Sequence, residues 1–150
     1  MILISHRGNI TGPNPDNENK PDYILNAINQ GYDVEIDIWG IDNKIFLGHD
    51  KPQYEVSIEW LSDKRIVKFG WFHCKNLDSW KLIKSYGLNS FFHNNDDYTL
   101  TSKGYIWSYP GKEECGCICV MPEWDNRKIL DGLVGICSDH ISSYKLEMVT

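Results

Sequence analysis

No stretch of this sequence stays apolar over enough residues to cross a membrane. The longest apolar runs fall far short of the roughly 20 residues that a spanning helix needs. Residues 1–6, MILISH, have neither a basic leader nor an apolar segment of signal-peptide length. We therefore predict a cytoplasmic protein with no membrane span.

Basic residues are too few and too scattered to form a nucleic-acid surface. The chain has 15 Lys and Arg against 21 Asp and Glu, a formal net charge of −6. Binding a phosphate backbone normally requires a concentrated basic surface, and the sequence has no such cluster. Nucleic acid is thus excluded as a partner, and no feature of the sequence indicates an oligomeric state.

The cysteines show no pairing pattern. There are five, an odd number, with no CxxC pair, which fits neither a disulfide framework nor a zinc ribbon. Cys115, Cys117 and Cys119 would share one side of a strand and could bind a soft metal, but free cysteine is among the residues most often buried. We therefore expect reduced thiols.

The length and composition are those of one globular domain. The 150 residues are 41% hydrophobic and 24% charged, which are ordinary proportions for a folded protein. A chain of this length can enclose a hydrophobic core without disulfides or structural metals. We predict a single domain over residues 1–150.

Segments typical of strands and of helices alternate along the chain. The apolar run of residues 1–5 indicates a buried strand, and residues 21–30 have apolar positions at helical spacing that Gly31 ends. Residues 32–41 alternate apolar and polar side chains as a strand does, and residues 44–50 add the second strand of a hairpin. Further strands are predicted at 70–75, 90–93, 105–109, 117–121 and 134–137, and helices at 57–63, 77–86 and 124–130.

This alternation predicts a parallel α/β fold. Recurrent strand-then-helix units imply parallel pairing with right-handed crossovers. In such folds functional residues gather at the C-terminal ends of strands, which is where the sequence has His6, Glu35, Asp37, His73 and Lys75. A complete barrel has about 250 residues, roughly 200 at the low end. The fold prediction is therefore a compact, reduced TIM-type (βα)8-like barrel in which several outer helices are missing or shortened.

Two carboxylates lie two residues apart in the alternating strand. Glu35 and Asp37 would point to the same face, where mutual repulsion raises one pKa unless a cation lies between them. A hard divalent cation such as Mg²⁺ or Ca²⁺ removes this repulsion. A lone pair of this kind more often decorates the solvent face of an edge strand, but here neighbouring segments also end on His6, Arg7 and His49.

Histidine, arginine and a divalent metal together suit cleavage of a phosphodiester. His6 and His49 can act as general acid and base because unperturbed imidazole titrates near neutrality. Arg7 can hold phosphoryl oxygens by a planar, bidentate pair of hydrogen bonds. The residues therefore predict a metal-dependent phosphodiesterase with catalytic His6 and His49, substrate-binding Arg7, and the metal ligands Glu35 and Asp37.

Four short motifs follow one another over residues 4–50: His6-Arg7-Gly8, Glu18-Asn19, Glu35-Ile36-Asp37 and His49-Asp50. Their order and spacing resemble those of the glycerophosphodiester phosphodiesterases and, more distantly, the sphingomyelinases D and other phospholipase-C-like barrels. The resemblance implies a TIM-type barrel, a histidine acid/base pair, and a divalent metal on the two carboxylates, Mg²⁺ or Ca²⁺ first and Mn²⁺ second. It also implies that a substrate hydroxyl next to the phosphorus attacks first and forms a cyclic phosphate.

Beyond residue 50 the resemblance depends mainly on Phe72-His73-Cys74-Lys75. The family has an acidic metal ligand there, followed two residues later by a phosphate-binding lysine, which implies substrate binding for Lys75 and a place among the metal ligands for His73. A histidine removes a negative charge and is a softer ligand, so Mn²⁺ or Zn²⁺ becomes competitive. Alternatively, His73 is not a ligand.

The expected substrate follows from the same resemblance. Only residues 51–70 separate His49-Asp50 from the next strand, so the chain lacks the subdomain that the family inserts there to shape the substrate pocket. We expect a small-molecule phosphodiester, either a glycerophosphodiester or a related compound such as a lysophospholipid. The alternative is a catalytically impaired protein on the same barrel that binds a phosphodiester or a phospholipid headgroup.

Several residues keep open interpretations outside the predicted site. Glu18 would brace the neighbouring arginine or favour a helix N-terminus. Some side chains would either line the pocket or pack elsewhere: Trp39, Trp107, His93 and Asn94. Asp139, within Ser138-Asp139-His140, resembles the acidic position at the last strand end of the family, and we assign it no role.

Overall fold

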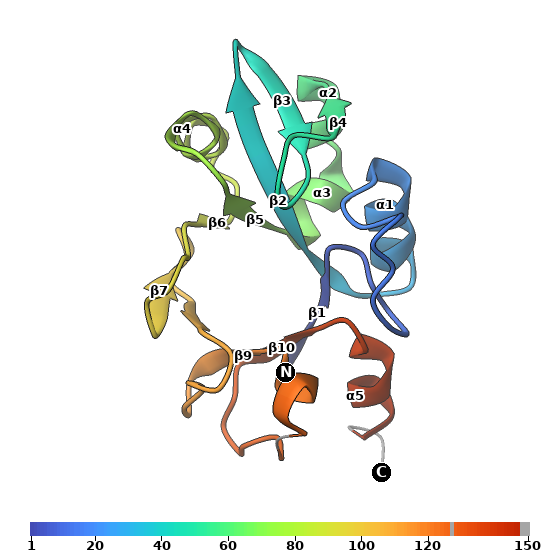
Figure 1. Ribbon diagram of the computed structural model, residues 1–150, viewed down its shortest axis with the longest axis vertical. Helices are drawn as coiled ribbons and strands as arrows, with labels where there is room; N and C mark the ends of the chain where they lie inside the picture. Colours follow the sequence, from blue (N-terminus) through green and yellow to red (C-terminus); the bar gives the residue numbers. More distant parts are fainter. Residues whose placement is uncertain (127, 148–150) are drawn as a thin grey trace.

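Ten strands join into one sheet that curls into a half-barrel with helices on its outer side (Figure 1). This is the arrangement in the computed structural model, which describes residues 1–126 and 128–147. Along the chain the elements are β1 Ile2–His6, α1 Pro21–Asn29, β2 Asp33–Ile41, β3 Lys44–Leu47, β4 Tyr54–Val56, α2 Ile58–Leu61, α3 Lys64–Phe69, β5 Gly70–Cys74, α4 Leu77–Ser85, β6 Ser90–Phe91, β7 Tyr98–Leu100, β8 Ile106–Ser108, β9 Cys117–Val120, the 3-10 helix η1 Pro122–Asp125, β10 Gly135–Ser138 and α5 Ile141–Glu147.

The middle of the sheet is parallel. Its order is β6-β5-β2-β1-β10-β9-β8, and every neighbouring pair in this series is parallel. Strand β3 pairs with the C-terminal half of β2, β4 pairs with β3, and β7 pairs with β8. These three pairs are antiparallel. Strand β2 pairs with β1 and β3 along one edge and with β5 along the other, so it has strand partners on both edges.

The prediction of a (βα)8-like barrel is wrong. The sheet is mixed, and the described residues 92–116, between β6 and β9, contain no helix; the β7–β8 hairpin takes its place. A complete (βα)8 barrel needs roughly 200 residues or more, and this chain has 150. Ser102 N donates to Ser90 O over 2.7 Å, but among the described residues no strand ladder joins β6 to β7.

Most other predicted elements are confirmed to within a few residues. The helix expected at 21–30 is α1, which begins with Pro21 and buries Ile24, Ala27 and Ile28. The helix expected at 77–86 is α4, whose Asn76 side chain accepts from Ser79 N in a reciprocal capping box. The sequence did not reveal β4, α3, β7 or α5.

The helix predicted at 124–130 is wrong over its described part. Only the single 3-10 turn η1 forms there, and residues 128–130 are not helical, while residue 127 lies outside the described residues. No disulfide joins any of the five cysteines, all of which lie in the described part of the chain. No helix in the described parts of the chain is long and apolar enough to cross a membrane.

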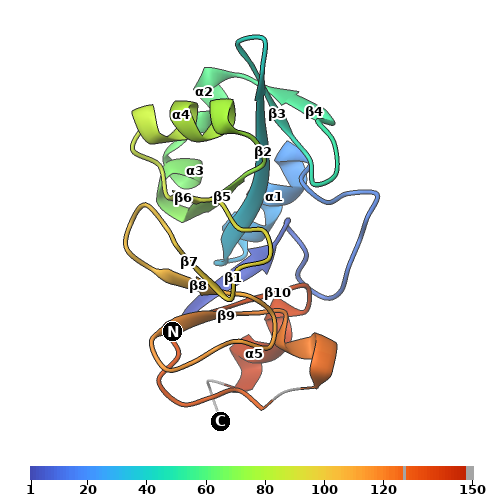
Figure 2. The same ribbon diagram turned by 60° about the vertical axis from the view of Figure 1, so that its left-hand side comes forward.

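The two faces of the curled sheet have different surroundings. On the outer face, Val34, Ile36 and Ile38 of β2 pack against helices in the largest core cluster, and Figure 2 shows α1 to α4 gathered around β2 to β5. On the inner face a second cluster fills the curl with apolar side chains: Ile4, Trp71, Phe91, Trp107, Ile118, Val120, Met121 and Cys137. Because side chains alternate, the next inner-face residue after Ile4 is His6 and after Trp71 is His73. Polar groups therefore lie at the C-terminal ends of the strands, next to the apolar cluster of the inner face.

Candidate active site

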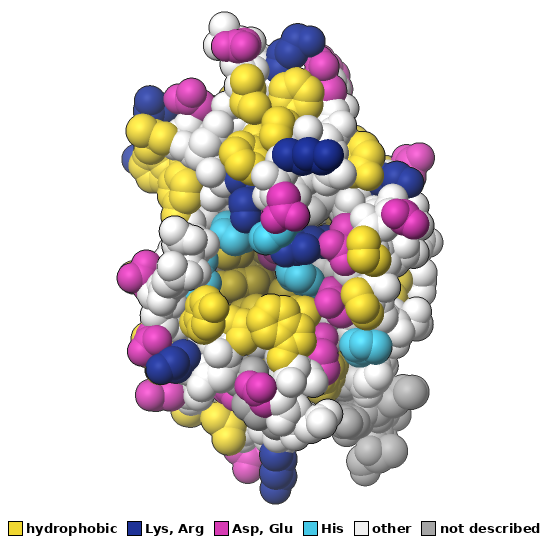
Figure 3. Space-filling view, viewed as in Figure 1, with side chains coloured by type: hydrophobic (Ala, Val, Ile, Leu, Met, Phe, Trp, Pro, Cys, Tyr) yellow, Lys and Arg dark blue, Asp and Glu magenta, His cyan; other side chains and the backbone are white. Residues whose placement is uncertain are grey.

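A cavity of about 300 Å³ lies at the C-terminal ends of the parallel strands, on the inner face of the sheet. Figure 3 shows histidine side chains together with basic ones on one side of this hollow and hydrophobic side chains on the other. Five predicted site residues line it: His6, Arg7, Glu35, His49 and His73. The remaining two, Asp37 and Lys75, contact these residues, and Lys75 also lines an adjoining pocket with His73. The structure thus brings all the predicted site residues together.

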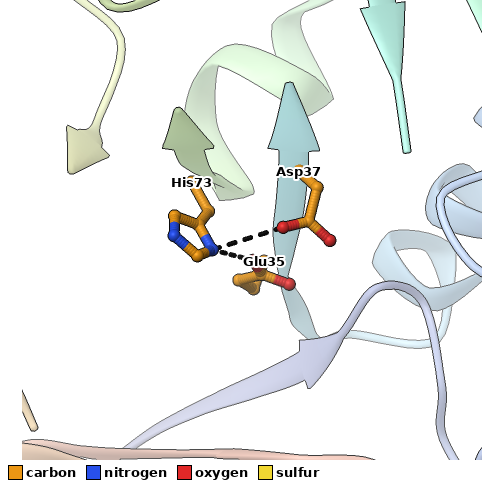
Figure 4. A group of neighbouring side chains, drawn as sticks. All are labelled: Glu35, Asp37 and His73. Carbon is orange, nitrogen blue, oxygen red and sulfur yellow. Dashed lines mark ion pairs between the residues drawn. The ribbon is translucent and has the colours of Figure 1, made fainter. Parts of the chain in front are cut away.

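Glu35 and Asp37 of β2 and His73 of β5 form a buried cluster (Figure 4). The carboxylate residues are 2% and 0% exposed. Nδ1 of His73 lies 3.4 Å from Oε1 of Glu35 and 3.2 Å from Oδ1 of Asp37. One ligand atom from each residue lies within 4.8 Å of the others. The three side chains could therefore share one metal ion.

Two further observations bear on whether a metal fits. Oε2 of Glu35 is buried and has no hydrogen-bond partner among the described residues, although such an atom is costly to leave unpaired. Nε2 of His73 lies 3.0 Å from the backbone oxygen of His93, to which it donates. Metal-binding histidines commonly donate their second N–H in this way, which directs the free nitrogen at the metal. The donor set therefore fits a divalent cation.

The pKa values of His73 and Asp37 show which positive charge a bound metal would replace beside the carboxylates. Burial alone would lower the pKa of His73, but hydrogen bonds and charge from Asp37 and Glu35 raise it to about 9. Burial also opposes ionisation of Asp37, yet hydrogen bonds from His49 and His73 and the charge of Arg7 hold its pKa well below the ordinary value. A proton on Nδ1 of His73 and a metal ion are therefore alternative partners of the two carboxylates.

Asp37 is the centre of a larger polar network. Its Oδ2 lies 3.1 Å from Nε of Arg7, and its Oδ1 lies 3.4 Å from Nζ of Lys75. Nδ1 of His49 lies 3.2 Å from both carboxylate oxygens. The Asn19 side chain donates to Oδ2 over 2.9 Å and accepts from the backbone N of Asp37 over 3.0 Å. This carboxylate thus positions both cations and one of the two predicted catalytic histidines.

His6 is oriented from the opposite side by Asp139. Nδ1 of His6 lies 2.8 Å from Oδ1 of Asp139, which leaves Nε2 on the side of Glu35, 4.0 Å from Oε2. Burial lowers the pKa of His6, but the hydrogen bond with Asp139 and the charge of Glu35 outweigh it and raise that pKa. Burial likewise opposes ionisation of Asp139, and the His6 contact still lowers the Asp139 pKa.

Arg7 and His6 are joined through a chain of side-chain hydrogen bonds. Nη1 of Arg7 donates to Oε2 of Glu18 over 3.1 Å, which agrees with the first of the two interpretations of Glu18. The fully buried Asn9 donates to Oε1 of Glu18 over 2.9 Å and to Oδ1 of Asp139 over 2.7 Å. Sequence reasoning missed Asn9 because one asparagine in a loop rich in asparagine forms no pattern.

The turn after β1 directs Arg7 to this network. Arg7 has φ +54°, in the left-handed region that costs energy for a residue with a Cβ. Its backbone N donates to the oxygen of Glu35 over 3.1 Å. Gly8 follows with φ +94°, and an added Cβ would lie 2.6 Å from Cδ1 of Tyr23. The HRG motif therefore has a structural reason: any side chain at the third position would be strained and would displace the Tyr23 ring.

The residues with open interpretations divide into two groups. Trp107, His93 and Asn94 line the cavity, whereas Trp39 donates through Nε1 to the backbone oxygen of Gly48 over 2.7 Å.

Comparisons with family models, with curated proteins and with solved structures find no match for this chain. The case for a function therefore depends on the geometry of the site.

Proposed function

We propose that the chain is a metal-dependent phosphodiesterase related to the glycerophosphodiester phosphodiesterases. Its substrate would be a glycerophosphodiester or a related small phosphodiester such as a lysophospholipid. The convergence of His6, His49 and Arg7 on one cavity supports this proposal most strongly, together with Lys75, which lines the adjoining pocket and contacts the buried Asp37. We keep the cytoplasm as the proposed location on the sequence alone.

Glu35, Asp37 and His73 would hold the divalent metal, with Mg²⁺ or Ca²⁺ as first candidates and Mn²⁺ favoured by the histidine. A metal bound there supplies charge stabilisation to the phosphoryl group. Arg7 and Lys75 would bind the phosphoryl oxygens. Arg7 is already held by Glu18 and Asp37 and Lys75 by Asp37, so their charges need little reorganisation when the substrate binds.

His6 and His49 would transfer the protons. His6 donates its Nδ1 proton to Asp139, and its Nε2 can accept the proton of a substrate hydroxyl next to the phosphorus. That oxygen bonds to phosphorus, the bond from phosphorus to the leaving alcohol oxygen breaks, and His49 protonates the departing oxygen. The first product is a cyclic phosphate. His49 is suited to face the leaving group because its side chain is 37% exposed.

A second candidate function is binding of a phosphodiester or headgroup without turnover. The charge balance of the site favours this alternative, because Arg7, Lys75 and a protonated His73 together compensate Glu35 and Asp37 without a metal. The two functions differ in which residues they need. An enzyme requires both catalytic histidines, whereas a binding protein requires the arginine and the lysine.

The test compares the wild type with His6→Ala and His49→Ala. Product release is measured from glycerophosphodiesters, lysophospholipids and a chromogenic phosphodiester, with Mg²⁺, Ca²⁺ or Mn²⁺ in turn. We expect metal-dependent turnover that falls roughly 100-fold or more in each variant and persists in the control His140→Ala, whose side chain does not line the cavity. Turnover that survives both substitutions would contradict the mechanism. Absence of turnover, with phosphodiester binding that needs Arg7 and Lys75, would establish the binding protein.

A further inference from the structure

The cavity has two chemically different halves. The half formed by β1, β2 and β5 is charged, as described above. The opposite half comes from β8, β9 and η1: Trp107, Val120 and Met121 are buried there at 4%, 8% and 2% exposure, and Trp124 lies at the rim at 63% exposure. In Figure 3 hydrophobic side chains form this side of the hollow. The proposed phosphodiesterase mechanism uses none of these four residues.

The apolar half lies directly beside the metal-binding half. The ring of Trp107 stacks on Phe91 with centroids 4.5 Å apart, and Phe91 in turn stacks on His73 at 5.0 Å with an interplanar angle of 11°. Stacked rings of this kind fix one another in position. A group bound against Trp107 would therefore lie next to a phosphoryl group held by the charged half.

Trp124, at the rim of the cavity, belongs to η1, and hydrogen bonds attach this turn to the C-terminal end of β10. Oε1 of Glu123 accepts from the Ser138 hydroxyl over 2.8 Å and from the backbone N of Asp139 over 2.9 Å. Met121, before η1, has φ +50°, a conformation that a bulky residue keeps only where its surroundings impose it. The turn is thus tied to the strand end that orients His6, although it leaves a large aromatic side chain exposed.

We propose that Trp107, Val120, Met121 and Trp124 form a subsite for a compact apolar group, aromatic or short alkyl, on one oxygen of the phosphodiester. The inference rests on the proposed function and names the substrate class. Their indole N–H groups can donate but not accept, so the O–H or N–H groups of a polyhydroxylated or charged alcohol would lose hydration there without finding an oxygen or nitrogen acceptor on these side chains. The cavity, about 300 Å³, is at the small end of ligand sites, which suits one compact group beside a phosphate.

The test uses two substrates that share one glycerol and differ in the other alcohol, glycerophosphoethanolamine and the benzyl ester of glycerol phosphate. Both leaving groups are primary alcohols. Rates are measured by ³¹P NMR with the best metal for the wild type, for Trp124→Ala, and for Tyr86→Ala. Tyr86 is a matched control because it is also an exposed aromatic residue, at 45%, and lies at the end of α4 away from the cavity.

We expect the wild type to favour the benzyl ester by roughly tenfold in kcat/KM, and Trp124→Ala to remove most of that preference by slowing the benzyl ester alone. Tyr86→Ala should behave as the wild type. Equal use of the two esters by the wild type, or equal slowing of both by Trp124→Ala, would overturn the subsite while leaving the phosphodiesterase intact.

Failure of the proposed function would be distinguishable. If neither ester is cleaved with any metal, binding of benzyl phosphate and of inorganic phosphate is measured by calorimetry on the same proteins. Tighter binding of benzyl phosphate that Trp124→Ala weakens roughly tenfold would support the subsite in a binding protein. Equal affinity for the two probes, or affinity that Trp124→Ala leaves unchanged, would overturn it.

Discussion

Binding of a metal to Glu35, Asp37 and His73 should release a proton. His73 has a pKa of about 9, so at pH 7 its Nδ1 carries a proton where it faces the two carboxylates, because Nε2 already donates to the oxygen of His93. A metal can bind Nδ1 only after that proton leaves. Metal affinity should therefore increase with pH.

The size of the pH effect on metal affinity follows from the difference between the pH and the pKa of His73. At pH 7, two pH units below a pKa of about 9, the proton on His73 competes with the metal. This competition reduces the apparent association constant by about 100-fold, or about 2.7 kcal/mol. The constant should rise about tenfold per pH unit from pH 6 to pH 8 and level off above the pKa of His73. About one proton should be released per metal ion at pH 7 from this group.

Titration calorimetry with Mn²⁺ in two buffers of different ionisation heat counts the released protons. His73→Asp removes the imidazole that carries this proton, so the proton release set by the pKa of His73 should be lost, and the preference should shift toward Mg²⁺ and Ca²⁺. His140→Ala is the control and should behave as the wild type. Metal affinity of the wild type that does not change between pH 6 and 8, or binding without proton release, would show that the metal does not displace a proton from His73.

The metal-free protein should show the opposite trend. The folded-state pKa of His73 is raised above its ordinary value of 6.5, so its contribution to stability is fully present below about pH 6.5 and is lost as the pH rises through about 9. The melting temperature measured in the presence of a chelator should therefore decrease over this range. A saturating metal should remove the decrease.

Three other substitutions test the structure around the site, and a fourth, Gly87→Ala, is the control for one of them. Asp139→Asn removes a charge but keeps the shape, and should lower the pKa of His6 in an NMR titration and reduce turnover roughly 10- to 100-fold; an unchanged pKa would contradict the pairing. Asn19→Ala removes two hydrogen bonds to the buried aspartate of β2 and should cost about 2–3 kcal/mol in urea unfolding. A loss near zero would mean that these bonds add nothing. Gly8→Ala adds a methyl group 2.6 Å from the tyrosine ring of α1 at φ +94° and should cost about 2 kcal/mol or more. Gly87→Ala, at φ +64° with no atom within 4 Å, measures the backbone strain alone and should cost about 1 kcal/mol.

The strands that carry the site could be predicted because their signals are local. The alternation over β2 places Glu35 and Asp37 on one face without reference to any other segment. The apolar runs of β1 and β5 likewise end close to His6 and His73. Their meeting at one cavity followed from parallel pairing, since such strands bring their C-terminal ends to one edge of a sheet.

The rest depended on contacts that the local sequence does not report. Asp139 is 133 residues from His6 and reaches it because β10 pairs with β1, with Ser138 beside Ser5. The absence of a closed barrel depended on residues 92–116, where the β7–β8 hairpin stands in place of a crossover helix. Hydrophobic periodicity identifies a strand but not its partner or the direction of pairing.

By itself, the sequence determined the local framework: the alternating strand with its two carboxylates, the strand that ends on His73 and Lys75, and the turn at Gly8. These follow from side-chain periodicity and backbone sterics within a few residues. Three features come from the folded chain alone: the sheet curls without closing, Asp139 and Asn9 complete the network, and aromatic residues face the charged groups across one cavity. Those features arise from pairing and packing between distant segments, whose energies depend on the whole fold.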